Sequence, residues 1–152
     1  MKVLLIAGAR PNFMKIAPII HAIHDHNLQN EDQIIQYRLI HTGQHYDRKM
    51  SESFFEQLNI PRPDVNLGVG SGSQAFQGGT IMMRYEQALE DWKPELCLVV
   101  GDVTSTMACA IVAKKARIKL GHVEGGIRSG DMTMPEEINR IVTDSITDYF
   151  FT

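Results

Sequence analysis

Residues Leu96–Val100 (LCLVV) form a continuous apolar run that passes directly into Gly101–Thr106 (GDVTST). An unbroken apolar run, without alternation of polar and apolar side chains, is typical of a strand buried on both faces of a parallel sheet. Asp102 follows just after this strand, and a cluster of hydroxyl side chains follows where the next helix should begin. This stretch therefore predicts the type of sheet and a place where polar groups meet its edge.

The remainder of the sequence repeats this alternation of strand and helix. Short apolar runs are separated by segments in which apolar residues recur at helical spacing. Such alternation with short connections indicates right-handed βαβ units, so the sequence predicts an α/β fold with a doubly wound, Rossmann-like parallel sheet. The predicted strands are Lys2–Ala7, Ile34–His41, Asp64–Leu67, Leu96–Val100, Leu120–Val123 and Tyr149–Phe151. The predicted helices are Phe13–His26, Arg48–Leu58, Gln74–Trp92, Ser105–Arg117 and Pro135–Asp148.

The size and charge of the chain narrow the classes of function. Its 152 residues, 43% of them hydrophobic, suffice for one domain with a sizeable core. With 15 Lys and Arg against 18 Asp and Glu, the net charge of −3 disfavours nucleic-acid binding through a broad basic face. No apolar run approaches the ~18 residues that a membrane span requires, and the amino terminus lacks the cleavage site of a signal peptide.

Two cysteines, Cys97 and Cys109, lie within apolar segments. Their number and spacing fit neither a disulfide framework nor a zinc site, so we expect packing residues in a reduced, cytoplasmic protein without a metal centre. The sequence ends on the strand-like segment Tyr149–Thr152 (YFFT), with no helix or turn after it. We therefore expect residues 1–152 to be one domain of a longer protein.

The first predicted strand is followed by a loop that carries two cations. Gly8 permits a tight turn, and Pro11 suits the first turn of a helix. Arg10 and Lys15 lie beside the amino terminus of that helix, where cationic side chains and the helix dipole together favour a phosphate or a carboxylate. A surface arginine and a solvated lysine would give the same pattern, so this loop alone leaves both interpretations open.

Two other loops carry weaker signals. No G-x-G-x-x-G fingerprint follows the first strand, which argues against a dinucleotide cofactor. Gly70–Ala75 (GSGSQA) matches a looser form of that motif, but it follows a very short predicted strand, and we attribute it to chance. After the second strand, Thr42–Asp47 (TGQHYD) is rich in hydrogen-bonding groups. His45 in this segment is a candidate for substrate contact, although a histidine that only bonds its own loop is the simpler interpretation.

The strongest signal is a pair of carboxylates at corresponding positions. Asp102 follows the strand Leu96–Val100, and Glu124 follows the strand Leu120–Val123 in the same way. If these strands are neighbours, about 4.8 Å apart, both carboxylates face one crevice. Each carboxylate alone would more often be a helix cap or an ion-pair partner, but the two together favour a functional site.

A third acidic candidate lies at the start of the last predicted helix. In Pro135–Arg140 (PEEINR), proline opens the helix and the glutamates suit its positive end. Glu136 and Arg140 are four residues apart, so we expect them to pair on one surface of the helix. Taken alone, this motif indicates only a well-capped helix.

Five motifs, in this order and spacing, make the chain resemble one family. They are GARPNFMKIAP (8–18), TGQHYD (42–47), VVGDVTST (99–106), HVEGGIRSGD (122–131) and MPEEINR (134–140). Together they resemble the N-terminal half of the non-hydrolysing UDP-N-acetylglucosamine 2-epimerases, over essentially the whole chain. The resemblance implies the glycosyltransferase-B architecture, in which two Rossmann-like domains flank a deep cleft. It also implies that the second, C-terminal domain, which makes most of the nucleotide contacts, is absent from this chain.

The resemblance implies a reaction that needs no cofactor and acts on a UDP-amino sugar. UDP leaves carbon 1 of UDP-N-acetylglucosamine by anti elimination to give 2-acetamidoglucal. It then adds again with a proton delivered to the other face of carbon 2, which gives UDP-N-acetylmannosamine. Matched residue by residue, the acid–base candidates are Asp102, Glu124 and Glu136. The positions matched to substrate contacts or charge partners are Arg10, Lys15, His45 and Arg140. The resemblance also allows a homodimer of the complete enzyme.

Three alternatives stay open at this stage. A hydrolysing relative would share the fold and most motifs, and would release N-acetylmannosamine and UDP. A glycosyltransferase of the same architecture would bind its acceptor in this half, but the carboxylates together with Arg10 are less expected there. A flavodoxin-like binding module would have an acidic first loop, where this chain carries Arg10 and Lys15. Asn12 stands where the family often has glutamate, which leaves the substituents of the sugar open.

Overall fold

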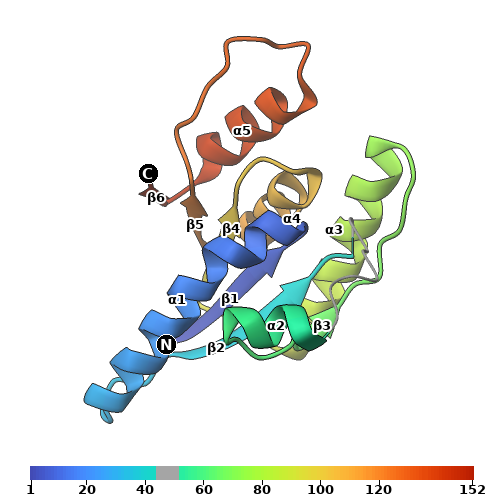
Figure 1. The fold of residues 1–152 in the computed structure, drawn as a ribbon. Helices are drawn as coiled ribbons and strands as arrows, with labels where there is room; N and C mark the ends of the chain where they lie inside the picture. The colour runs from blue at the N-terminus through green and yellow to red at the C-terminus, as the bar shows by residue number, and fades with distance from the viewer. Residues whose placement is uncertain (44–51) are drawn as a thin grey trace.

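The computed structural model of the protein describes residues 1–43 and 52–152. Within these residues, six strands form one parallel sheet in the order β3-β2-β1-β4-β5-β6 (Figure 1). The predicted doubly wound α/β fold is therefore confirmed. The strands are β1 (Lys2–Ala7), β2 (Gln36–His41), β3 (Val65–Asn66), β4 (Leu96–Val100), β5 (Lys119–Val123) and β6 (Tyr149–Phe151).

Helices cover both faces of the sheet. Successive side chains of β1 point to opposite faces, so Val3 and Leu5 pack against α1 and α2, while Leu4 and Ile6 pack against α3 and α4. Helix α5 packs against α4 and β5 (Figure 1). None of the described helices combines the length and apolar character needed to cross a membrane. The helices are α1 (Arg10–Gln29), α2 (Glu52–Leu58), α3 (Gln74–Asp91), α4 (Thr104–Lys115) and α5 (Pro135–Ile146).

The first helix begins at Arg10, three residues before the predicted start. The side chain of Asn12 explains this early start, because its Oδ1 accepts hydrogen bonds from the backbone N–H groups of Gly8 and Ala9, each at 3.0 Å. These bonds satisfy amides at the strand-to-helix turn, where a helix itself offers no partner. The predicted start of the second helix, at Arg48, lies outside the described residues.

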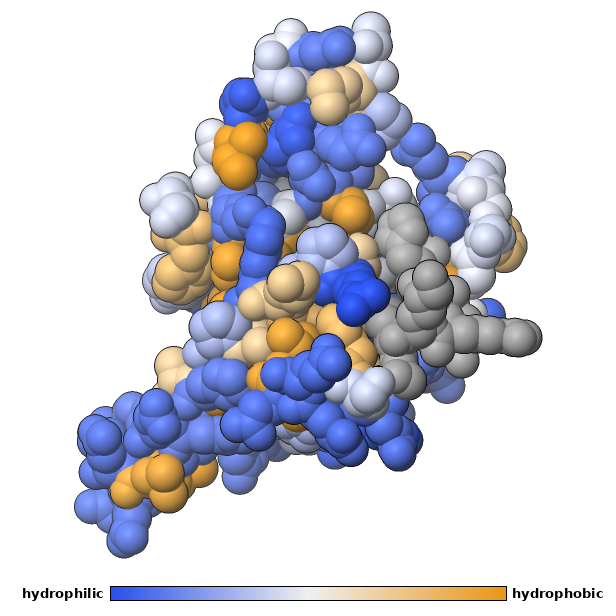
Figure 2. All heavy atoms as spheres, viewed as in Figure 1, coloured by the Kyte–Doolittle hydropathy of each residue, from blue (hydrophilic) through white to orange (hydrophobic). Residues whose placement is uncertain are grey.

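The predicted strand Tyr149–Phe151 is present as β6, but it is not buried. Its three side chains are about half exposed, at 51%, 50% and 51%. The reason is that β6 pairs only with β5 and forms the edge of the sheet within the described residues. Figure 2 shows apolar side chains gathered over this edge of the molecule.

Both cysteines are packing residues in the larger core cluster, as predicted. Burial raises the pKa of the Cys97 thiol to about 12, although a hydrogen bond with the Tyr85 hydroxyl, at 3.0 Å, opposes this rise. Burial also raises the pKa of Cys109 well above its ordinary value. Neither thiol can therefore form a reactive thiolate near neutral pH while the fold persists.

We expect iodoacetamide at pH 8 to leave Cys97 and Cys109 unmodified in the folded protein, because the thiolate is the reacting form. Both should be alkylated after unfolding in guanidinium chloride. Mass spectrometry of the two cysteine-containing peptides, with and without denaturant, provides the measurement. Rapid alkylation of either thiol in the folded protein would contradict the assignment to the core.

Candidate active site

The turns that follow β4 and β5 lie side by side at the carboxyl edge of the sheet. The two strands pair in parallel with Val100 opposite Val123, and the N–H of Gly101 donates to the carbonyl oxygen of Val123 at 3.1 Å. The two strands are thus neighbours, which is the condition under which both carboxylates were expected to face one crevice. Asp102 and Glu124 therefore start from neighbouring positions on one edge, where ligands of open parallel sheets bind.

Glu124 is held in an unusual backbone conformation and paired with a cation. Its φ is +68°, in the left-handed region that costs a non-glycine residue about 1–3 kcal/mol. Its carboxylate forms an ion pair with Lys15 of α1, with Nζ and Oε2 2.5 Å apart. Both side chains stay accessible to solvent, at 33% for Glu124 and 44% for Lys15. The pair therefore lies where a ligand can reach it.

Asp102 is paired with Arg140 of α5. The Nη1 of Arg140 donates to Oδ2 of Asp102 at 2.6 Å, and its Nε donates to Oε1 of Glu137 at 3.0 Å. The expected surface pair between Glu136 and Arg140 was therefore wrong. The side chain of Arg140 turns inward and is only 8% exposed, and on that side of the helix Glu137, three residues away, is its partner.

Glu137 is buried and bonds several groups, and it was not among the site residues predicted from the sequence. Besides Arg140, it accepts hydrogen bonds at Oε2 from the backbone N–H of Ser129 at 2.9 Å, from the Ser129 hydroxyl at 3.1 Å and from the N–H of Gly130 at 2.5 Å. Burial by itself would raise the pKa of Glu137, but the hydrogen bonds from Arg140, Gly130 and Ser129 outweigh it and lower the pKa to about 2. Glu137 thus stays ionised and ties the loop before α5 to Arg140.

Glu136 lines a separate groove close to the Asp102 turn. The groove has a volume of about 200 Å³ and lies between the starts of α3, α4 and α5. Asn139, which also lines it, donates from Nδ2 to the carbonyl oxygen of Asp102 at 2.9 Å. Within the described residues, Glu136 has no ion pair with Arg140 or with any other cation. Its lining residues are Gln74, Gln77, Val103, Thr104, Pro135, Glu136 and Asn139.

Arg10 lies at the start of α1 but contacts a different element. Its guanidinium carbon lies 4.7 Å from the centre of the Phe54 ring of α2, a cation–π arrangement. Across residues 1–43 and 52–152, Arg10 forms no ion pair with a carboxylate. His45, the remaining predicted substrate contact, lies outside the described residues. Lys15, Asp102, Glu124 and Arg140 are therefore the predicted site residues that the structure joins into two ion pairs.

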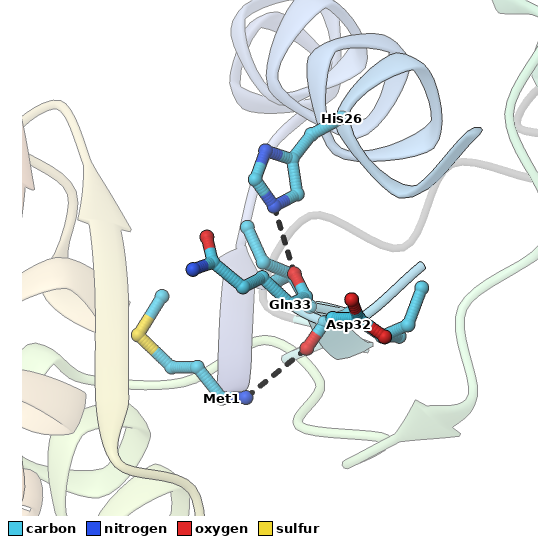
Figure 3. A pocket seen from close by; sticks show the side chains of 6 residues that line it. Met1, His26, Asp32 and Gln33 are labelled. Atoms are coloured by element: carbon cyan, nitrogen blue, oxygen red, sulfur yellow. Dashed lines mark hydrogen bonds between the residues drawn. The ribbon is translucent and has the colours of Figure 1, made fainter. Parts of the chain in front are cut away.

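A pocket at the amino ends of the strands, opposite the carboxyl edge, does not belong to this site. It is lined by residues that precede β1 and β2, among them Met1 and His26 (Figure 3). Two hydrogen bonds join residues of its lining: His26 Nε2 lies 2.8 Å from the carbonyl oxygen of Gln33, and the Met1 amino group donates to the carbonyl oxygen of Ile34 at 3.1 Å. This pocket lies at the amino ends of the strands, away from the ligand edge of such sheets.

The family model described as UDP-N-acetylglucosamine 2-epimerase matches residues 26–152. The chain belongs to this epimerase family. It is 47% identical, over 152 residues, to the UDP-N-acetylglucosamine 2-epimerase homolog of Methanococcus maripaludis, covering 100% of this chain and 40% of that protein. It is 44% identical to the UDP-2,3-diacetamido-2,3-dideoxy-D-glucuronate 2-epimerase of Pseudomonas aeruginosa over 151 residues, or 99% of this chain and 41% of that protein.

The fold agrees with a solved epimerase. The crystal structure of the Methanocaldococcus jannaschii UDP-GlcNAc 2-epimerase in complex with UDP-GlcNAc and UDP superimposes with a TM-score of 0.89 at 43% identity. The match covers 100% of this chain and 40% of that one. The chain thus spans about 40% of the length of the epimerases that it matches.

Glu137 should make the stability of this epimerase-family chain depend on acid pH. Its pKa is lowered from 4.5 to about 2 in the fold, so its contribution is present above about pH 4.5 and is lost as the pH falls through about 2. We expect Glu137→Gln to lower the free energy of unfolding at pH 7, and the difference from the unmodified protein to shrink between pH 4.5 and 2. Urea denaturation at several pH values measures this difference in the free energy of unfolding.

Glu136→Gln is the matched control, because the neighbouring carboxylate has no ion pair among the described residues. It should change stability little at any pH. A stability loss for Glu137→Gln that stays constant from pH 7 to pH 2 would contradict the assigned ionisation.

Proposed function

We propose that the protein interconverts UDP-N-acetylglucosamine and UDP-N-acetylmannosamine by eliminating UDP and adding it again. The observation that carries this proposal is the placement of Asp102 and Glu124 on adjacent turns, each carboxylate held by a cation from a different helix. Membership in the UDP-N-acetylglucosamine 2-epimerase family supports the same reaction.

The chemistry accounts for this set of side chains. The proton on carbon 2 of the sugar is not adjacent to a carbonyl, so its direct removal is very unfavourable. When UDP begins to leave carbon 1, positive charge develops there and the carbon 2 proton becomes acidic. Carboxylates can then remove that proton and return one to the opposite face, and cations can stabilise the departing diphosphate. We assign the acid–base steps to Asp102, Glu124 and Glu136.

The ion pairs give the carboxylates of Asp102 and Glu124 a defined direction before substrate arrives. Arg140 is buried and fixed by Glu137, so it can hold Asp102 without large motion. Lys15 is more exposed and can move from Glu124 to a phosphate oxygen, so we assign it to the diphosphate. Arg10 and His45 are proposed as further substrate contacts. Prearranged groups of this kind lower the barrier because less reorganisation accompanies the reaction.

We also propose that a second, C-terminal domain completes the cleft and binds the nucleotide, with residues 1–152 as the N-terminal domain. This chain matches about 40% of the length of its relatives, which is consistent with that arrangement. The homodimer that the family resemblance allows stays a prediction.

A second candidate substrate follows from one relative. The Pseudomonas aeruginosa protein, at 44% identity, is named for a UDP-2,3-diacetamido sugar acid. A third outcome is hydrolysis, in which water captures the sugar and free N-acetylmannosamine is released. The three possibilities share the elimination step and differ in the substrate or in the product.

The complete protein, incubated in D₂O with UDP-N-acetylglucosamine, should form UDP-N-acetylmannosamine. Because proton removal and return pass through solvent-exchanging carboxylates, deuterium should appear at carbon 2 of both UDP-sugars. Proton NMR and mass spectrometry measure it. Accumulation of free N-acetylmannosamine with UDP would contradict the proposal and show that the protein hydrolyses its substrate. Turnover of UDP-2,3-diacetamido-2,3-dideoxy-D-glucuronate, with no turnover of UDP-N-acetylglucosamine, would show that the sugar acid is the substrate.

Asp102→Asn and Glu124→Gln should each reduce turnover by about 10²–10⁴-fold, because they keep the shape of the side chain and remove acid–base capacity. The affinity for UDP, measured by calorimetry, should change little. Glu31→Gln, at an exposed turn near the opposite edge, is the matched control and should retain full turnover. If both site variants lose less than about tenfold, the two carboxylates are structural ion-pair partners of Lys15 and Arg140 instead.

A further inference from the structure

We propose that His122 and Asp144 form a positioning pair that fixes the turn carrying Asp102 against the turn carrying Glu124. This role rests on the proposed function. His122 lies on β5, and its side chain is fully buried. Its Nε2 lies 2.7 Å from the carbonyl oxygen of Gly101, the residue immediately before Asp102. The buried imidazole therefore bonds to the carboxyl end of β4, the strand next to β5.

Asp144 connects the same histidine to the second turn. Its Oδ1 lies 2.6 Å from Nδ1 of His122. Its Oδ2 accepts hydrogen bonds from the N–H of Gly126 at 3.0 Å and from Nη1 of Arg128 at 2.6 Å. Both donors follow Glu124 within a few residues. Two buried side chains thus link the turn after β4, the turn after β5 and helix α5.

The hydrogen-bond partners fix the orientation of the pair. Each ring nitrogen of His122 faces an oxygen, one in a carboxylate and one in a carbonyl group, so the ring bridges Asp144 and Gly101. Burial by itself would raise the pKa of Asp144, but hydrogen bonds from Arg128, His122 and Gly126 outweigh it and lower the pKa. A buried carboxylate with this many donors has a well-defined orientation.

The two turns need such support because their backbones are constrained. Gly101, Glu124 and Gly126 all have positive φ, at +76°, +68° and +86°. The turn after β5 also lies close to Asp144, since a β-carbon on Gly125 would lie 3.3 Å from its Oδ1. Without the pair, we expect the backbone of Glu124 to relax from its left-handed conformation. Its carboxylate would then move away from Asp102.

Asp148 provides a matched control within the same chain. It also accepts a backbone hydrogen bond from β5, from the N–H of Leu120 at 2.8 Å, and pairs with Lys114 at 2.8 Å. It lies near the opposite end of β5, however, away from the Asp102 and Glu124 turns. Asp148→Ala should therefore weaken the fold in a similar way without disturbing those turns.

The conservative variant Asp144→Asn separates geometry from charge. A carboxamide can donate from Nδ2 to Nδ1 of a neutral His122, while its oxygen still accepts from Gly126 and Arg128. All the hydrogen bonds of the pair can then persist. Asp144→Ala removes every hydrogen bond that Asp144 makes, to His122, Gly126 and Arg128. A positioning role predicts activity near normal for the asparagine variant and a large loss for the alanine variant.

The experiment compares Asp144→Ala, Asp144→Asn and Asp148→Ala in the complete protein, well below their melting temperatures. For deuterium incorporation at carbon 2, Asp144→Ala should lower kcat by about tenfold to 10²-fold with KM nearly unchanged, because small misplacement of reacting groups is costly. Asp144→Asn should stay within about threefold of the unmodified protein. Asp148→Ala should lose melting temperature but not kcat.

Amide hydrogen exchange, read by mass spectrometry, tests the same pair without any catalytic assay. Asp144→Ala should speed exchange in residues 101–104 and 124–130, and Asp148→Ala should not. Unchanged exchange there, equal kcat loss in Asp148→Ala, or an asparagine variant as poor as alanine would each overturn the positioning role. If the unmodified protein shows no exchange at carbon 2, the proposed function fails, while hydrogen exchange still tests the pair.

Discussion

The parallel pairing of β4 with β5 is the constraint on which the remainder of the structure depends. The side chains of Cys97, Leu98, Val99 and Val100 are buried, and they lie on both faces, so helices must cover both faces of these strands. The polar groups of the candidate site lie at the edge, where each strand ends. The register that places Val100 opposite Val123 brings two carboxylate-bearing turns to one place, and ion pairs from α1 and α5 converge on it.

Helix α5 is turned so that its polar side faces inward. Glu137, Asn139, Arg140 and Thr143 are buried, whereas Ile138 and Ile141 are 44% and 37% exposed. The helix therefore covers the polar turns of the site, with side chains that bond to Asp102 and to residues 129–130. Burying Glu137 and Arg140 has a desolvation cost that their hydrogen bonds must offset. Such a pair contributes a defined geometry for Asp102 more than it contributes stability.

Most of the fold could be predicted because its signals are local. Apolar runs give the strands within one or two residues, and the rule for parallel sheets selects the turns after β4 and β5. The partners inside the site could not be predicted in the same way. Glu136 and Glu137 are adjacent glutamates, and only the rotation of α5 about its axis decides which one meets Arg140. His122 lies within the short apolar strand LGHV, where sequence alone does not distinguish a histidine that bonds two neighbouring elements from one that only packs.

In the turn between β1 and α1, the side chain of Asn12 bonds backbone groups at the carboxyl edge of the sheet. Asn12 is 6% exposed, and its oxygen already accepts the N–H groups of Gly8 and Ala9. Its amide nitrogen faces the Gly101 turn, where a β-carbon would lie 3.4 Å away. The N–H groups of Gly8 and Ala9, just before α1, are thus used within the protein. Lys15, which reaches Glu124 from the same helix, is placed to provide a cation for an anionic ligand at this edge.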